Sequence, residues 1–188
     1  MSESKVVALE INGYEYVDLG LPSGLRWATC NVGANSPEEY GDYYAWGELE
    51  VKSVYTDVNS LTYHKDYSDI SGNPTYDVAR AKWGSSWRLP TEAEFKELID
   101  NCKWEWTIRE GKKGYNVIGS NGNSIFLPAA GYRYGSSLDE TGEYGYYWNS
   151  IPNERNDYSA GRLLFNSSTH YVNWGYRSGG RSVRPVSE

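Results

Sequence analysis

The apolar positions of the chain follow a helical period in one long segment and a short β pattern, broken by turn residues, in most of the rest. In that segment the apolar residues recur at the i, i+3, i+4, i+7 spacing of one buried helix face: Phe95, Leu98, Ile99 and Cys102. Thr91 and Glu94 form a capping box just before it, because each side chain can bond the backbone N–H of the other residue. The pattern predicts a helix that ends near Cys102.

A second, shorter helix is predicted over residues 75–83. Val78, Ala81 and Lys82 would share its buried face. Gly84 suits its end, because glycine adopts the left-handed conformation of a C-terminal cap.

The remaining pattern is typical of β structure. Asn12-Gly13 lies between alternating apolar residues and predicts a tight hairpin, since both turn positions need a positive φ. A second hairpin is predicted around residues 119–123. Further short strands are expected at 25–28, 146–150, 160–165, 170–172 and 182–185, an aromatic strand or core loop at 43–47, an irregular excursion at 51–73 and a loop at 136–145. Together these elements predict an α+β fold with few helices and many short strands.

Composition changes the expected core. The 188 residues suit one domain, residues 1–188, and include 18 Tyr and 8 Trp against 3 Phe. The mean hydropathy of −0.69 is low for a folded chain. Buried Tyr and Trp need polar partners, so we expect a core of hydrogen-bonded aromatic side chains rather than an aliphatic one. Most of the tryptophans are assigned to it, with Trp174 set apart as a binding candidate.

Charge and apolar patterning limit the partners. The net charge is −7 and the longest basic run is Lys112-Lys113, which argues against a nucleic-acid partner. No apolar run approaches membrane-spanning length, so no membrane insertion is expected. Residues 1–10 lack the apolar core of a signal peptide.

Candidate catalytic chemistry is sparse. His64 and His170 stand in unrelated contexts, and no nucleophile elbow is visible. Carboxylate pairs such as Asp139-Glu140 are interpreted as loop or helix-surface charges. Cys30 and Cys102 match no metal motif, and free buried thiols are favoured over a disulfide. We expect no enzyme activity and no cofactor, while a structural calcium held by loop carboxylates stays open.

Residues 149–181 differ from the rest of the chain in being rich in Tyr, Asn, Ser and Gly. Tyr and Trp give large contact areas at low entropic cost, and Ser, Gly and Asn give adaptable hydrogen bonds. Aliphatic and aromatic framework residues such as Leu163, Phe165 and Val172 interrupt this composition. The segment is therefore interpreted as a ligand-binding region, and the alternative is a Gly- and Asn-rich sheet edge with long loops.

Several motifs resemble a known family. Residues 87–95 (WRLPTEAEF) resemble the signature of the formylglycine-generating-enzyme-like branch of the C-type lectin fold. Residues 16–28 (YVDLGLPSGLRWA), 41–48 (GDYYAWGE), 126–133 (FLPAAGYR) and 182–186 (SVRPV) are similar to the Fibrobacter succinogenes major paralogous domain. The resemblance covers nearly the whole chain and implies a compact C-type-lectin-like fold.

The last third resembles the variable proteins of diversity-generating retroelements, which replace template adenines with random bases. This resemblance implies a non-enzymatic, receptor- or adhesin-type protein that binds an unknown protein or glycan on a cell surface, and a bacterial surface, extracellular or virion location. The candidate ligand-binding residues are those of a type reachable by such changes, together with Trp174, which an Asn codon cannot reach: Asn149, Ile151, Asn153, Arg155, Asn156, Asp157, Tyr158, Ser159, Gly161, Arg162, Asn166, His170, Tyr171, Asn173, Trp174, Gly175, Tyr176, Ser178, Gly179, Gly180 and Arg181.

Two other functions compete with this interpretation. A carbohydrate-binding surface module of the same fold would use a fixed site with aromatic stacking on sugars. An oxidoreductase of the formylglycine-generating kind would need a reactive cysteine pair late in the chain, where this sequence has no cysteine. Arg177 and Arg184 fall at framework positions of the resemblance, which implies a structural role for them.

Overall fold

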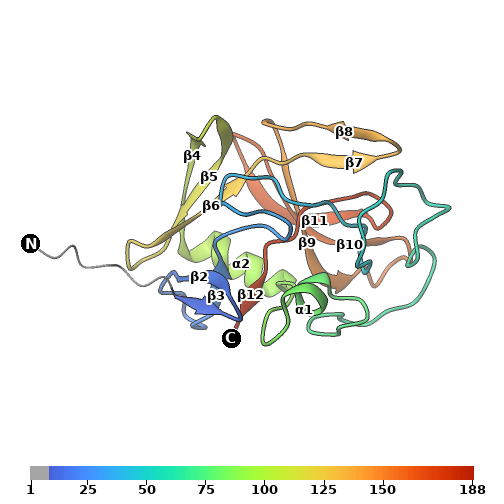
Figure 1. Cartoon of the computed structure of the whole chain (residues 1–188), viewed down its shortest axis with the longest axis horizontal. Coiled ribbons are helices and arrows are strands. Elements are labelled where there is room, and N and C mark those ends of the chain that lie inside the picture. Colours follow the sequence, from blue (N-terminus) through green and yellow to red (C-terminus); the bar gives the residue numbers. More distant parts are fainter. Residues whose placement is uncertain (1–8) are drawn as a thin grey trace, which may run out of the picture.

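The computed structural model describes residues 9–188, and these form a mostly β protein with two helices (Figure 1). This agrees with the small helix content expected of the α+β class. Residues 1–8, where the sequence lacks a signal-peptide pattern, lie outside the described part. The elements, in chain order, are β1 (Glu10–Ile11), β2 (Tyr14–Asp18), β3 (Arg26–Ala28), α1 (Val78–Trp83), α2 (Glu92–Asn101), β4 (Lys103–Arg109), β5 (Lys112–Ile118), β6 (Ser124–Pro128), β7 (Tyr132–Tyr134), β8 (Ser137–Asp139), β9 (Gly145–Pro152), β10 (Ser159–Phe165), β11 (His170–Tyr176) and β12 (Val186–Ser187).

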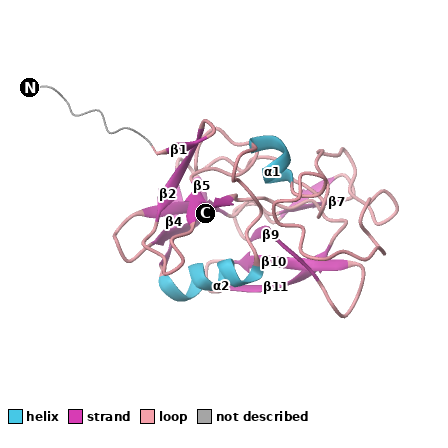
Figure 2. Ribbon diagram, turned by 90° about the horizontal axis from the view of Figure 1, so that it is seen from below, coloured by secondary structure: helices cyan, strands magenta, loops and turns pink. Residues whose placement is uncertain are grey.

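The strands form small antiparallel sheets rather than one large one. Their orders are β1-β2-β3-β12, β11-β10-β9, β4-β5-β6 and β7-β8. β12 pairs with β3, which brings the C-terminus beside the N-terminal hairpin (Figure 1). Helix α2 packs along the sheet of β9, β10 and β11 (Figure 2).

Both predicted hairpins are confirmed. Asn12 and Gly13 have positive φ angles of 51° and 83° between β1 and β2. Strands β5 and β6 pair around the turn at residues 119–123. The predicted long helix is confirmed as α2, with its capping box between Thr91 and Glu94.

The sheet of β9, β10 and β11 separates two apolar clusters. Tyr147, Leu163 and Phe165 point to the cluster that also contains Phe95 and Leu98 of α2. Trp148, one residue after Tyr147, points to the second cluster, as alternation along a strand requires. The sheet is therefore covered on both faces.

The expected hydrogen-bonded aromatic core is confirmed. Trp46 and Trp148 donate their indole N–H groups to the carbonyls of Asn149 and Tyr44, at 2.9 and 2.7 Å. The buried Tyr147 hydroxyl donates to the carbonyl of Pro128 at 2.7 Å. The buried Trp27 indole N–H is an exception, with no acceptor among residues 9–188.

The predicted face of the short helix is wrong. Helix α1 begins after Asp77, whose side chain accepts hydrogen bonds from the backbone N–H groups of Ala79 and Arg80. Its buried residues are Val78, Ala79 and Trp83, while Ala81 and Lys82 are exposed. The helix is only six residues long, and the stacking of Trp83 on Tyr14 at 4.0 Å fixes its rotation.

Two strand assignments also need correction. The strand expected at residues 182–185 is absent, because the chain there makes only single backbone contacts with separate segments. Ser182 forms an isolated bridge with Tyr147, Val183 and Pro185 accept backbone N–H groups from Val32 and Ala28, and regular pairing begins only in β12. The loop expected at residues 136–145 contains β8, whose three exposed residues carry no apolar period and are held by pairing with β7. Residues 43–47 form a buried core loop with one bridge, from Tyr44 to Arg181.

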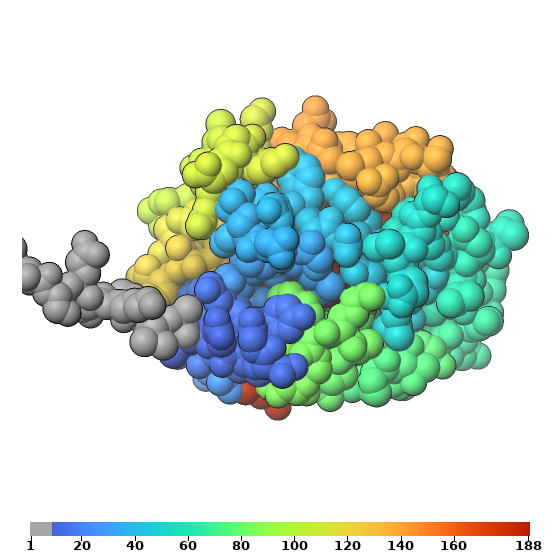
Figure 3. All heavy atoms as spheres, viewed as in Figure 1, coloured from blue at the N-terminus to red at the C-terminus, as the bar shows by residue number. Residues whose placement is uncertain are grey.

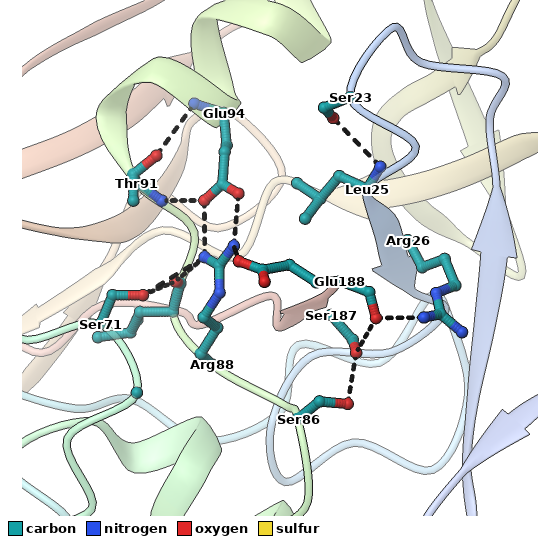
Figure 4. Close-up of polar contacts among 12 residues, drawn as sticks. Ser23, Leu25, Arg26, Ser71, Ser86, Arg88, Thr91, Glu94, Ser187 and Glu188 are labelled. Carbon is teal, nitrogen blue, oxygen red and sulfur yellow. Dashed lines mark hydrogen bonds and ion pairs between the residues drawn. The ribbon is translucent and has the colours of Figure 1, made fainter.

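Arg88 joins the start of α2 to the C-terminus (Figure 4). Its guanidinium donates to both carboxylate oxygens of Glu94 at 2.7 Å and to Glu188 at 2.9 Å. Glu94 also accepts the backbone N–H of Thr91 at 2.8 Å. Burial would raise the pKa of Glu94, but these hydrogen bonds outweigh it and hold the pKa below its ordinary value.

We expect Glu94→Gln to lower the free energy of unfolding at pH 7 by about 1–3 kcal/mol, because a half-buried guanidinium loses its charged partner. A lowered folded-state pKa stabilises the protein above the unfolded pKa, and this stabilisation is lost as pH falls through the folded value. Urea unfolding followed by tryptophan fluorescence should therefore show the difference between the two proteins shrinking below about pH 4.5. Glu92→Gln, in the same helix turn, is the matched control and should change little. If the difference in free energy of unfolding between the wild type and Glu94→Gln did not change with pH, the role of the Glu94 carboxylate as a charged partner of Arg88 would be contradicted.

Candidate functional site

The segment at residues 149–181 covers the end of β9, all of β10 and β11, and the turn that follows. Pairing of β10 with both neighbours brings the segment into one sheet. The candidate residues are thus close together in space, but they do not form one exposed face.

The structure exposes some of the candidate residues and buries others. Those at least partly exposed are Ile151, Asn153, Arg155, Asn156, Asp157, Tyr158, Arg162, Asn166, His170, Tyr171, Asn173, Trp174 and Tyr176. Those buried are Asn149, Ser159, Gly161, Gly175, Ser178, Gly179, Gly180 and Arg181. Burial corrects the interpretation of six of these residues as surface contacts: Asn149, Ser159, Gly161, Gly175, Ser178 and Gly180. Gly179 and Arg181 are buried too, but they line a pocket.

Close packing explains the buried glycines. A Cβ on Gly161 would lie 2.4 Å from the Asn149 side chain, and a Cβ on Gly180 would lie 2.7 Å from the ring of Tyr55. Atoms of different side chains do not approach so closely in a packed interior. These positions belong to the framework of the sheet.

Three candidate asparagines stabilise their own loops. Asn153 and Asn166 each accept a backbone N–H two residues ahead, and Asn166 also accepts that of Thr169. Asn156 accepts the N–H groups of Tyr158 and Ser159. Such Asx turns are the common structural use of asparagine in loops, so their side-chain oxygens are already occupied.

The exposed aromatic residues of β11 lie on different sides of the sheet. Residues directly opposite in an antiparallel pair share a face, and Trp174 pairs with Gly161 while Val172 pairs with the buried Leu163. Trp174, 41% exposed, is therefore on the α2 side. Tyr171, 43% exposed, is on the other side with Arg162. Tyr176, 59% exposed, lies against Tyr158 with ring centroids 5.8 Å apart.

One concave feature of the segment is a pocket on the Tyr171 side, with a volume of about 570 Å³. Candidate residues supply Arg162, Tyr176, Gly179 and Arg181 to its wall. Its other residues lie outside the segment: Asp57, Tyr63, Tyr132, Tyr134, Glu140 and Tyr146. We call it the arginine pocket.

Sequence reasoning missed those six residues. Asp57 and Tyr63 lie in the excursion at 51–73 and Glu140 in the loop predicted at 136–145, and both stretches were treated as connections. Tyr132 and Tyr134 lie just before that loop, and Tyr146 begins the strand predicted at 146–150. A bridge between the buried Tyr55 and Gly135 brings these stretches together, with backbone hydrogen bonds of 2.8 and 2.7 Å. Figure 3 shows the two stretches side by side on the surface. The density of tyrosines was the only signal in the sequence.

A second depression, of about 610 Å³, adjoins the loop between β9 and β10. Asn153, Arg155, Asn156 and Asp157 line it together with the buried Arg177. Asp157 bonds the His64 ring at 2.7 Å, and this hydrogen bond lowers the pKa of Asp157. The residues that line this depression are polar or charged, and Tyr67 is the one aromatic residue among them.

The cysteines and histidines show no catalytic arrangement among the described residues. Cys30 and Cys102 are free and half-buried, and burial, with a contribution from Glu97, raises the pKa of the Cys102 thiol to about 11. His170 stacks on Trp104 at 4.4 Å, and burial lowers its pKa. No group of three metal-ligating side chains gathers within residues 9–188. Neither helix of the described part has the length and apolar content needed to cross a membrane.

Comparison of the chain with family models, with curated proteins and with solved structures gives no match.

We expect Gly161→Ala to destabilise the protein by about 1–3 kcal/mol, because the added methyl group overpacks the contact with Asn149. Thermal unfolding followed by circular dichroism measures the effect. Ser167→Ala, in the exposed turn between β10 and β11, should leave the unfolding midpoint nearly unchanged. Equal stability of both variants would show that position 161 is free to vary.

Proposed function

We propose that this chain is a non-enzymatic ligand-binding protein with a C-type-lectin-like fold and a surface diversified in residues 149–181. The observation that carries the proposal is the placement of large exposed aromatic residues and a concave pocket on this segment. Tyr171, Trp174 and Tyr176 are all more than one-third exposed although they lie on or at the end of an ordered strand. Aromatic and arginine side chains dominate binding hot spots.

The burial pattern also supports different roles for buried and exposed positions within residues 149–181. Packed positions such as Gly161 and Gly180 hold the sheet, and exposed positions between them can change without disturbing it. A rigid strand that carries exchangeable side chains positions a binding surface more accurately than a free loop does. In this proposal the partner is a protein or glycan on a cell surface, and the location is a cell surface, a virion or the extracellular space.

A second candidate is a fixed-site carbohydrate-binding module of the same fold. The arginine pocket favours it, because five tyrosines converge on a cavity whose size is within the ordinary range of small-molecule sites. Six of the ten residues in its wall lie outside the segment proposed to vary. An oxidoreductase role is less well supported, since Cys102 has a raised rather than a lowered pKa.

Deep sequencing of the 3′ end of the gene across the source population tests the diversification. We expect substitutions that trace to adenines and fall at exposed positions such as Asn173 and Tyr176. Codons of packed positions such as Gly161 and Gly180 should stay constant, because their variants fold poorly. A uniform sequence throughout the segment would overturn diversification and leave the fixed-site candidate.

Glycan and protein arrays probed with the purified chain test ligand binding. Tyr171→Ala and Trp174→Ala, on opposite faces of the sheet, distinguish which face binds the ligand found. The variant on the binding face should weaken binding by about tenfold or more, as truncation of an aromatic anchor does. Ile108→Ala, an exposed apolar residue of β4, is the control and should bind normally. Unchanged binding by both aromatic variants would contradict the assignment of the segment.

A further inference from the structure

Two arginines in the arginine pocket lack an acidic partner. Within residues 9–188, neither Arg162 nor Arg181 takes part in an ion pair. Buried or half-buried charges are normally paired, since an uncompensated charge in a protein interior is strongly unfavourable. Asp57 and Glu140 line the same pocket and the charge of Glu140 acts on Arg162, but within residues 9–188 neither carboxylate forms an ion pair with these arginines, so their guanidinium groups keep donors free for a ligand.

Arg181 is 5% exposed and extends beneath the pocket. Its Nη1 donates to the carbonyls of Tyr176 and Gly179 at 2.7 and 3.3 Å, and its guanidinium lies 4.4 Å from the centre of the Trp148 ring. Its Nε is buried without an acceptor, and none of the described residues accepts a bond from its Nη2. Burial lowers the pKa of Arg181 well below its ordinary value, and the charge of Arg162 lowers it further. Guanidinium groups nevertheless keep their charge in proteins.

Arg162 lies beside it on β10. Its guanidinium is 4.7 Å from the centre of the Tyr146 ring, and its Nε donates to the side-chain oxygen of Asn173 at 3.0 Å. The described residues offer no acceptor to its two terminal nitrogens. These nitrogens form the planar fork that binds a carboxylate through two parallel hydrogen bonds.

The other polar groups of the pocket are two carboxylates with neutral partners. Glu140 accepts the hydroxyl proton of Tyr146, and Asp57 accepts that of Ser178. Each carboxylate has further lone pairs, so each can accept a hydrogen bond from a ligand hydroxyl. Around them stand the rings of Tyr63, Tyr132, Tyr134, Tyr146 and Tyr176.

We infer that the arginine pocket binds a glycan through a carboxylate-bearing sugar, such as a uronic acid, whose carboxylate lies against Arg162 and Arg181. Sugar hydroxyls donate to Asp57 and Glu140, and the tyrosine rings contact the C–H faces of the sugar. This inference rests on the ligand-binding function proposed above. The inference holds whether residues 149–181 are fixed or diversified, provided that positions 162 and 181 are both arginine.

Two alternative occupants fit the pocket less well. An aspartate or glutamate side chain of a protein partner would occupy a small part of the 570 Å³ and bring no hydroxyl donors to Asp57 and Glu140. A phosphate group would carry more negative charge than a carboxylate toward the same two acids. A polyhydroxylated ring with a single negative charge uses the guanidinium, carboxylate and aromatic groups together.

Isothermal titration calorimetry with an oligogalacturonate and with its fully methyl-esterified form provides the test. An array extends the test to sialylated and glucuronate-terminated glycans, to their neutral parent glycans and to an aspartate-rich peptide. We expect binding of at least one carboxylated glycan, with its neutral or esterified form bound at least about tenfold more weakly, as loss of a charged hydrogen bond predicts. Affinity for the carboxylated form should fall as salt is raised.

The variants assign the interaction to the pocket. Arg162→Gln should reduce the affinity for the carboxylated glycan by about tenfold or more and leave that for its neutral form unchanged. Arg162→Lys should restore part of the loss, because it keeps the charge without the fork. Arg109→Gln, an exposed arginine of β4, is the matched control. Circular dichroism confirms the fold of each variant. A further variant, Arg181→Gln, should weaken binding of the carboxylated glycan in the same way, and if it fails to fold, Arg162→Gln still provides the test.

Four results would overturn the inference: no binding of any carboxylated glycan, equal binding of charged and neutral forms, preference for the peptide, or an Arg162→Gln variant that binds as the wild type does. A protein ligand found without carboxylated-glycan binding would overturn this inference and leave the proposed function intact. If deep sequencing found no variation in residues 149–181, the diversification proposal would be overturned, and the assignment of a carboxylated glycan to the arginine pocket would be unaffected.

Discussion

Hydrogen bonds from buried side chains to backbone carbonyls hold this protein together. Much of the chain is irregular, so many of its carbonyls have no strand or helix partner and must find one elsewhere. Arg177 donates to the carbonyls of Thr62, Lys65 and Ser159, and Arg184 to those of Ala28 and Phe126. Trp46 and Trp148 do the same from the aromatic core. Both arginines thus have the structural role that their framework positions implied.

This mode of packing buries side chains on both faces of the sheet of β9, β10 and β11. One face rests on α2 and the other on the loops that the buried tryptophans and arginines fix. Glycines at Gly161 and Gly180 let neighbouring side chains approach the backbone closely. Side chains that reach solvent from such a sheet are presented at defined positions without much loss of entropy on binding, which suits recognition.

The candidate site could be predicted only in part. The Tyr- and Asn-rich composition indicated a segment that contributes Arg162, Tyr176, Gly179 and Arg181 to the arginine pocket. Composition could not separate exposed from buried positions, because glycine and asparagine serve both contact surfaces and tight packing or turns. The tyrosines and acids of the opposite wall were missed, since they come from stretches far away in sequence that meet through pairing of Tyr55 with Gly135.

The sequence by itself determined the local elements. Asn12-Gly13 specifies its hairpin through backbone conformation, and the capping box with the apolar stripe of α2 specifies its helix, because these signals lie within a few residues of one another. The count of Tyr and Trp likewise determined that the core would be hydrogen-bonded. Tertiary structure decided the rotation of α1, the course of residues 182–185 and the arginine pocket. Each depends on partners many residues away, such as Tyr14 beneath Trp83, and no local pattern encodes which distant group will fill a given space.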